Sequence, residues 1–247
     1  MEDNKSSKKI TRIGDDGSSS TSTSDAPAFV PTAESAAKAR NFRIIAIISW
    51  IAAIGFEVGA IMVLKKVPIN TTWLIVMIVV DLIFAVVGSM LWKKSNRLDP
   101  ASEKDKTKFF IQNQLGAIMG IIAFLPLVIL IFTNKDLSGK QKGLVGTIAV
   151  VAMLIAGITG VDFNPPSQEQ YADQTREVET LMDGVNHVYW TKSGTSYHLY
   201  QDCSYINSAR TNEIFEGTVA QARELKNITD LCDRCENRRV KEKGGEE

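Results

Sequence analysis

The sequence predicts a membrane all-α four-helix bundle that is followed by a small C-terminal α+β domain. The bundle is indicated by four apolar blocks, each with about the 20 residues that a helix needs to cross a hydrocarbon layer of about 30 Å. The blocks cover residues 44–64, 72–92, 109–132 and 143–161. The second domain is indicated by strand-like segments after residue 186 and by all three cysteines, which lie within residues 203–235.

Residues 1–43 are predicted to be a disordered, Ser/Thr-rich N-terminal tail with a juxtamembrane segment. Up to residue 31 the segment is polar and low in complexity, so it has too little apolar surface to offset the entropy of ordering. Residues 33–43 are expected to form a helix that leads into the first span. The tail lacks the apolar core of a signal peptide, so the first span is expected to remain as an anchor.

The basic residues near the spans predict the orientation of the bundle, because Lys and Arg tend to stay on the cytoplasmic side. Residues 33–43 before the first span, the connector 93–108 and Arg176 together carry ten basic residues, whereas the other two connectors carry five. Both termini are therefore expected in the cytoplasm. In that reducing compartment, metal binding or redox chemistry is a better expectation for the cysteines than a stable disulfide.

Two carboxylates interrupt the apolar spans: Glu57 in the first and Asp81 in the second. A tight turn between these spans would place the two within about one helical turn of the same depth. Ionised carboxylates are costly in a membrane, so the pair is a candidate intramembrane site for a proton or a cation. The alternative is that each is protonated and hydrogen-bonded to a neighbour such as Ser49, Ser89 or Asn113.

The third span combines two glycines one helical turn apart with polar residues near its start. Gly116 and Gly120 allow a close crossing with another helix. The polar residues 112–114 are expected to form hydrogen bonds between helices. Bundle packing explains both features as well as a substrate path does.

Residues 162–186 are predicted to be a linker with a helical stalk. The two prolines at 165–166 end the fourth span, and Ser167 with Gln170 resembles a capping box that starts a new helix over 168–182. Gly184 is expected to close this helix.

The last domain, 187–239, is predicted to begin with a β-hairpin. Aromatic and β-branched residues at 187–191 and 196–200 flank a glycine turn at 192–195. A helix is expected over 218–226 and a tight knuckle over 231–235. Residues 240–247 are predicted to be a disordered tail.

Four soft donors in two pairs predict a metal site in this domain. The donors are His198 with Cys203, and Cys232 with Cys235. Each pair can hold one edge of a tetrahedron, and the set is typical of a structural zinc site without an open position. Two alternatives remain: a Cys-x-x-Cys thiol pair for redox chemistry, and ordinary buried cysteines. His187 lies outside the pattern and is expected at the surface or at a strand end.

Part of this domain resembles a small zinc module found in many bacterial proteins. The likeness is carried by residues 188–198, residues 202–205, Ala220 and the knuckle 231–235. The module is similar to the metal-binding domain of the Ada DNA-methyl repair protein, and the likeness covers about 187–239. In that family, a zinc-bound cysteine of the first pair accepts a methyl group. Here the matching position is His198, which cannot serve as that acceptor, so the resemblance implies a zinc fold rather than methyl transfer.

The charge of the C-terminal region argues against nucleic acid as a partner. Residues 163–247 contain ten basic and fifteen acidic side chains, whereas duplex binding depends on cations that displace counterions from phosphates. The expected partners are the lipid bilayer and an unidentified protein, and a second copy of the chain is a further candidate.

The expected function is that of an integral membrane protein that displays a cytosolic structural-zinc module and acts in interaction or sensing without catalysing a reaction. One alternative is a small proton- or cation-coupled transporter or channel-like protein that uses Glu57 and Asp81. A second is a membrane-tethered nucleic-acid-binding or redox protein.

Overall fold

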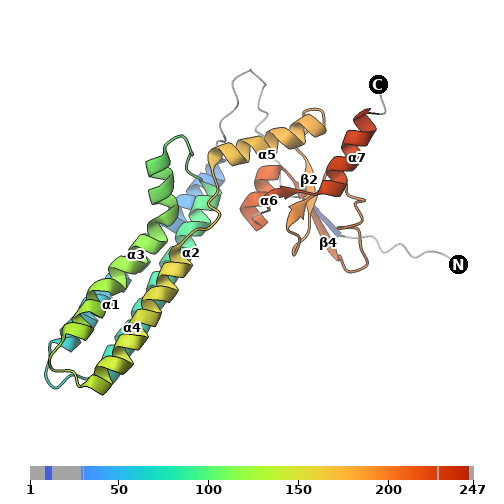
Figure 1. Ribbon diagram of the computed structural model, residues 1–247. Helices are drawn as coiled ribbons and strands as arrows, with labels where there is room; N and C mark the ends of the chain where they lie inside the picture. Colours follow the sequence, from blue (N-terminus) through green and yellow to red (C-terminus); the bar gives the residue numbers. More distant parts are fainter. Residues whose placement is uncertain (1–8, 13–28, 30, 227, 245–247) are drawn as a thin grey trace. The chain divides into compact units, whose positions relative to one another are not determined.

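The computed structural model describes residues 9–12, 29, 31–226 and 228–244. The chain divides into two compact units (Figure 1). One unit is a helical bundle that covers Ala33–Ser167. The other combines Gln168–Glu247 with the N-terminal segment Met1–Thr32, as far as these are described.

The bundle consists of four long helices, and each contains one of the predicted spans. Their bounds are α1 (Ala33–Leu64), α2 (Thr71–Leu98), α3 (Lys106–Thr133) and α4 (Gly139–Gly160). All four are long and apolar enough to cross a membrane. Because α1 begins at Ala33, the predicted helix before the first span is confirmed and is continuous with that span.

Side-chain caps start three of these helices. Asn70, Asp105 and Ser138 each accept a hydrogen bond from the backbone N–H three residues later. Ser138 also forms a capping box with Gln141. These contacts satisfy amides that have no partner within the helix, and so they fix where each helix begins.

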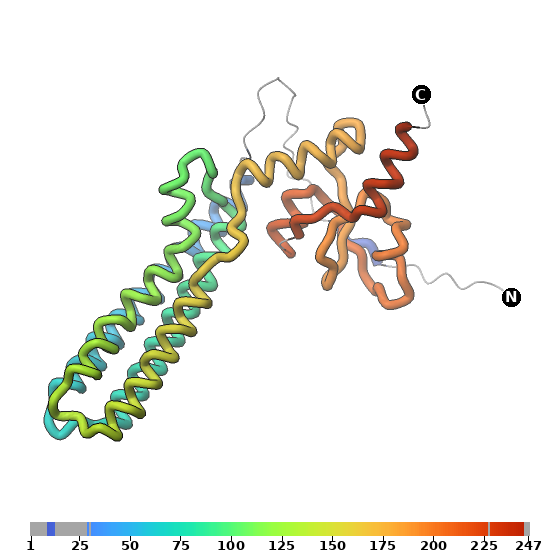
Figure 2. Tube along the Cα trace, in the orientation of Figure 1, coloured from blue at the N-terminus to red at the C-terminus, as the bar shows by residue number. Residues whose placement is uncertain are grey.

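The four helices run antiparallel to their neighbours in sequence (Figure 2). The α1–α2 and α3–α4 connections lie at the same end of the bundle, where Asn134 Nδ2 donates to the carbonyl of Leu64 at 3.3 Å. At that end, Gln141 Nε2 also donates to Thr71 Oγ1 at 3.0 Å. The start of α1 and the end of α4 therefore lie together at the opposite end.

Helices α3 and α4 cross closely through small residues. A Cβ atom added to Gly160 would lie only 2.4 Å from the backbone nitrogen of Ala117. A Cβ atom added to Gly116 would lie 3.0 Å from the carbonyl oxygen of Gly160, and one added to Gly120 would lie 3.1 Å from the carbonyl carbon of Ala156. The expected role of the glycine pair in a close helix crossing is confirmed.

The outer surface of the bundle is apolar. Large side chains such as Ile48, Ile51, Met62 and Ile158 are each about 60% exposed. Polar groups instead lie between the helices, where Asn96 Nδ2 donates to the carbonyl of Gln112 at 2.9 Å. This inverted distribution suits a bundle that is surrounded by lipid rather than by water.

In its described residues, the second unit contains short strands and three helices around a small core. Its elements are β1 (Lys9–Arg12), α5 (Gln168–Leu181), β2 (Val188–Trp190), β3 (Ser196–Tyr197), β4 (Glu213–Gly217), α6 (Val219–Lys226), β5 (Asp230–Leu231) and α7 (Asp233–Gly244). The strands form one sheet in the order β1-β4-β2 and a second, β3-β5. Trp190 and Tyr197 are fully buried between these elements and are the largest aromatic groups of the core.

The stalk helix and the helix over 219–226 agree with the predictions. Helix α5 begins at Gln168, and Gly184 lies beyond its end with φ of 88°, a conformation that favours glycine. Thr218 caps α6, because its Oγ1 accepts from the amide of Gln221 at 3.2 Å.

The predicted β-hairpin is only partly correct. Strands β2 and β3 meet at a single antiparallel bridge, Tyr189–His198, and belong to different sheets. β2 pairs instead with β4, a strand that the sequence analysis did not identify, and Trp190 stacks on Phe215 across this pair. The longer β4 offers β2 more backbone partners than the two-residue β3 does.

The prediction of disorder is wrong at two short segments. Residues 9–12 form β1, because the neighbouring edge of β4 supplies the backbone partners that an isolated tail lacks. The rest of the predicted disordered tail before residue 29 lies outside the described residues. At the other end, α7 continues to Gly244, since Lys243 Nζ donates to the carbonyl of Thr180 at 2.7 Å and holds the helix against α5.

Candidate metal centre

His198 is positioned by the bridge between the two arms of the partial hairpin. Its amide donates to the carbonyl of Tyr189 at 2.7 Å, and its own carbonyl accepts from the amide of Tyr189 at 2.8 Å. This pair of backbone bonds holds the start of the loop that follows β3. The side chain is 4% exposed.

Cys203 lies in a compact turn that follows His198. Its amide donates to the carbonyl of Tyr200, and its carbonyl accepts from the amides of Ile206 and Asn207 at 3.0 and 2.7 Å. The turn reverses the chain, so that the thiol points back toward the imidazole.

Cys232 and Cys235 lie where β5 ends and α7 begins. The amide of Cys232 donates to the carbonyl of Tyr197 at 3.0 Å, which joins the knuckle to the segment that carries His198. The carbonyl of Cys232 accepts from the amide of Cys235 at 2.9 Å, so the two thiols lie on the same side of the first helical turn.

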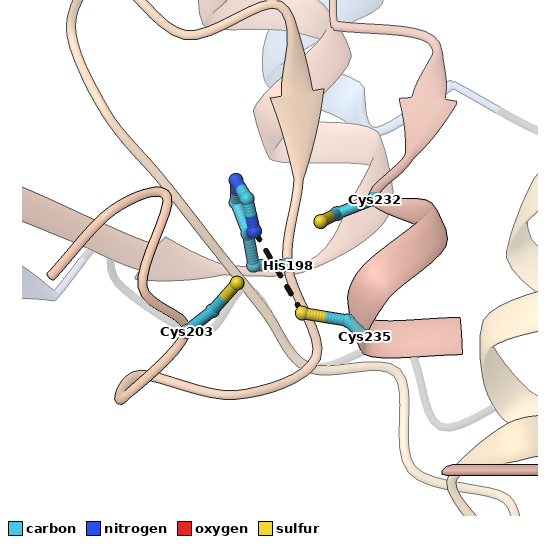
Figure 3. Close-up of side chains that lie close together, drawn as sticks. All are labelled: His198, Cys203, Cys232 and Cys235. Carbon is cyan, nitrogen blue, oxygen red and sulfur yellow. Dashed lines mark hydrogen bonds between the residues drawn. The ribbon is translucent and has the colours of Figure 1, made fainter. Parts of the chain in front are cut away.

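The four side chains converge on one point (Figure 3). The donor atoms of His198, Cys203, Cys232 and Cys235 all lie within 4.8 Å of one another, and all four residues are buried. Among the described residues, this cluster unites every cysteine of the chain. It is close enough to bind a metal ion, as the spacing of the two pairs predicts.

The distance between the imidazole and one thiol fits a tetrahedral site. Nδ1 of His198 lies 3.7 Å from Sγ of Cys235. Metal–ligand bonds of about 2.3 Å to sulfur and about 2.1 Å to nitrogen give a tetrahedral edge of about 3.6 Å. The ring can therefore bind an ion at the centre through Nδ1 with little rearrangement.

Burial sets the protonation states that a cation would encounter. It lowers the pKa of His198 to about 4, so the imidazole is neutral at pH 7 and keeps a lone pair. It raises the pKa of the Cys235 thiol to about 12, so this sulfur holds its proton until a cation displaces it. Metal binding at this centre must therefore release protons.

Helix α7 is held against the stalk by cations. Arg239 Nε donates to the carbonyl of Leu181 at 2.7 Å, and its guanidinium also forms an ion pair with Asp183. Near the cluster, the guanidinium of Arg238 lies over the ring of Tyr200, with 3.9 Å between its central carbon and the centroid.

A buried arginine joins α6 to the stalk and was not identified from the sequence. Arg223 is fully buried, and its Nη1 donates to the carbonyl of Tyr171 at 2.9 Å and to Gln174 Oε1 at 2.7 Å. Its central carbon also lies 3.9 Å from the ring centroid of Tyr171. The only sequence signal was an arginine at a position that the helical pattern assigns to the core.

The other histidine is not part of the cluster. His187 is partly exposed, and its Nε2 lies 3.8 Å from Oε2 of Glu216. This agrees with the expected place at a strand end, directly before β2.

The two carboxylates of the bundle lie on adjacent helices, Glu57 on α1 and Asp81 on α2. Glu57 is 5% exposed and Asp81 is fully buried. Oε1 of Glu57 and both carboxylate oxygens of Asp81 have no hydrogen-bond partner among the described residues. The two groups lie close enough to interact electrostatically.

The alternative partners considered for these carboxylates bind elsewhere. The hydroxyls of Ser49 and Ser89 donate to the backbone carbonyls of Phe84 and Ala85, at 2.8 and 2.9 Å. The side-chain Nδ2 of Asn113 donates to the backbone carbonyl of Phe109 at 2.9 Å.

No match was found when the chain was compared with protein-family models, with curated proteins and with solved structures.

Proposed function

We propose that this chain is an integral membrane protein that displays a zinc-stabilised module and uses the module to bind another protein. The observation that carries the proposal is the buried cluster of His198, Cys203, Cys232 and Cys235, whose donor atoms lie within 4.8 Å of one another.

The donor set favours zinc. Three thiolates and one imidazole are the ligands of structural zinc sites, and zinc accepts the tetrahedral geometry that the cluster can supply. Four protein ligands leave no coordination position for water or substrate, which supports a structural ion. The ion would join the loop after β3 to the start of α7, in a module whose core is small.

The chemistry of the module favours protein binding over methyl transfer or binding of nucleic acid. The position that matches the methyl acceptor of the Ada-like module is His198, and an imidazole does not supply that thiolate. The excess of acidic side chains over residues 163–247, fifteen against ten basic, disfavours binding to phosphates. An acidic surface suits a basic protein partner.

The membrane location is supported by the four long apolar helices and by the apolar outer surface of the bundle. The excess of basic residues at the end that carries both termini supports a cytoplasmic location for the module. There the cysteines stay reduced and free to bind a metal.

The proposal is tested with the full chain, purified in detergent. We expect about one zinc per chain by elemental analysis, and near zero for the double variant Cys232→Ser and Cys235→Ser. His187→Ala is the matched control, because this histidine lies outside the cluster, and it should keep its zinc. Wild-type protein without zinc would contradict the metal assignment.

The binding function is tested by cross-linking in membranes of the native host. A partner should be recovered with wild-type chain and with His187→Ala, and lost with the double cysteine variant. Recovery of the same proteins with all three chains would contradict a role for the folded module in recruitment.

A second candidate function is favoured by the buried carboxylates. Glu57 and Asp81 lack hydrogen-bond partners for three of their four oxygens among the described residues, and such groups in a membrane bind a proton, a cation or each other. The pair would then serve proton- or cation-coupled transport.

This second candidate is tested in proteoliposomes. Glu57→Gln and Asp81→Asn should each abolish a proton flux driven by a pH gradient. Glu34→Gln, which changes an exposed carboxylate on the same helix as Glu57, should leave the flux unchanged. Absence of flux in the wild-type chain would contradict a transport role.

A further inference from the structure

The N-terminal strand β1 lies alongside β4 in a parallel pair (Figure 1). The register places Lys9 beside Glu213 and Arg12 beside Glu216. Because strand β2 occupies the other edge of β4, β1 closes the sheet on its remaining side. A segment from the start of the chain thus completes a sheet formed near its end.

Charge contacts accompany this pairing. Lys9 Nζ lies 3.1 Å from Oε1 of Glu213, and the hydroxyl of Thr11 donates to the same oxygen at 2.6 Å. Arg12 Nε donates to Oε1 of Glu216. Both carboxylates of β4 are therefore matched by cations of the N-terminal segment.

Without β1, the backbone N–H and C=O groups along one edge of β4 would lack hydrogen-bond partners. Such edges are templates for another extended segment. Glu216 is 5% exposed, and besides Arg12 its ion-pair contact among the described residues is His187 at 3.8 Å. The edge is thus selective for an extended segment that brings positive charge.

The contact is poorly anchored. Ile10 of β1 remains 42% exposed, and the side chains of Lys9 and Arg12 are 76% and 87% exposed. Pairing therefore rests on backbone hydrogen bonds and charge, without an apolar side chain that fills a pocket. A longer segment with the same charges would bind the edge better.

The covalent chain explains how so short a strand stays bound. β1 and β4 belong to one chain, so their pairing is intramolecular, with an effective concentration on the order of 1 mM. This favours a contact that would be negligible between separate molecules.

We propose that this β4 edge is the surface through which the module binds its partner, and that residues 9–12 occupy the edge until the partner displaces them. The partner is a protein that supplies an extended basic segment, with two cations three residues apart to match Glu213 and Glu216. This inference rests on the proposed recruiting function and identifies the surface that performs it.

Hydrogen exchange on the full chain in detergent tests the occupied edge. The double variant Lys9→Glu and Arg12→Glu should speed exchange of the amides in 213–217 by about tenfold or more. Arg210→Glu, an exposed cation of the same unit, should not. The swap of Lys9→Glu with Glu213→Lys should restore slow exchange relative to Lys9→Glu alone. Equal exchange in the wild-type chain and the double variant would overturn the occupancy.

A labelled peptide with the sequence of residues 5–14 tests recognition, with fluorescence anisotropy as the readout. The double variant Lys9→Glu and Arg12→Glu should bind it about tenfold more tightly than the wild-type chain, whose edge is occupied. The same peptide with both changes should not bind. The peptide concentration is raised to 1 mM, about the effective concentration of the intramolecular pairing. If the double variant binds no peptide at this concentration, the β4 edge is not a docking site.

The cross-linking experiment separates this inference from the proposed function. If the partner is recovered more strongly with the double variant than with wild-type chain, the edge is the recruiting surface. If recovery is equal for both but still lost with the double cysteine variant, recruitment stands and the β4 edge is not its surface.

Discussion

Nδ1 of His198 lies 3.7 Å from Sγ of Cys235, although 37 residues separate them in the sequence. The imidazole comes from the residue that forms the β-bridge with Tyr189, and the thiol comes from the first turn of α7. A metal ion at this point would therefore connect the two halves of the module directly. Because the module buries a small core, we expect its stability to depend on this connection.

Loss of the imidazole should destabilise the module. We expect His198→Ala to release the metal and to reduce the near-ultraviolet circular dichroism of buried Trp190, as a chelator should do in the wild-type chain. His187→Ala should change neither signal. An unaltered Trp190 signal after complete metal removal would show that the fold does not depend on the ion.

Metal affinity should fall as the pH falls. Burial holds the pKa of Cys235 at about 12 without a cation, so binding at pH 7 must displace the thiol proton. The pKa of His198 is lowered to about 4, so the imidazole releases no proton in this range. Each displaced proton weakens binding about tenfold per pH unit. Competition with a chromophoric chelator between pH 6 and 8 measures the metal affinity. An affinity that stays constant over this range would contradict the displacement of thiol protons.

The crossing of α3 and α4 should tolerate no side chain at Gly160. A Cβ there would lie 2.4 Å from the backbone nitrogen of Ala117, whereas a Cβ on Gly157 of the same helix meets nothing within 4 Å. Gly160→Ala should cost about 1–3 kcal/mol of stability. Gly157→Ala should be neutral or slightly stabilising. Unfolding in mixed detergent micelles measures both, and equal stabilities would contradict the close crossing.

The buried guanidinium of Arg223 should be necessary for docking of the stalk. Burial lowers its pKa to about 10, so the group remains charged at pH 7 and donates to the carbonyl of Tyr171 and to Gln174. Arg223→Met leaves these acceptors without their donor, which should cost about 1–3 kcal/mol. Arg210→Met, at an exposed position, should cost nearly nothing. Thermal unfolding of the two variants provides the comparison.

Both ends of the chain should lie on the same side of the membrane. Pairing of β1 with β4 requires this, and four spans between the two segments satisfy it. With the proposed cytoplasmic orientation, a reporter that is active only in the cytoplasm should be active both when fused before Met1 and when fused after Glu247. Activity at one end alone would contradict either the number of spans or the strand pairing.

The sequence predicted those features that depend on local pattern. Runs of apolar residues indicated four helices, and the structure has a helix around each run, which satisfies the backbone hydrogen bonds of the segment internally as a lipid environment would require. The spacing of His198 with Cys203, and of Cys232 with Cys235, indicated a cluster, because ligands a few residues apart are brought together by single turns. Gly184 likewise indicated the end of the stalk helix through its own backbone freedom.

Features that depend on distant partners were missed. The segment 9–12 is polar and has no strand pattern, and it becomes β1 only because Glu213 and Glu216 lie along an edge that is open to it. The arms of the predicted hairpin were correct as extended segments, but β4 took the place of β3 as the main partner of β2. Nothing in the local sequence specifies which strand pairs with which.

The sequence by itself therefore determined the apolar helices, the four soft donors and the two carboxylates within the apolar runs, because composition and spacing along the chain suffice for these. Only the tertiary structure decided that the two donor pairs meet in one buried cluster, that Arg223 joins the stalk to α6, and that the first residues of the chain close the β4 edge. These depend on contacts between segments far apart in sequence, where the free energy of pairing is set by the shape and charge of the partner surface.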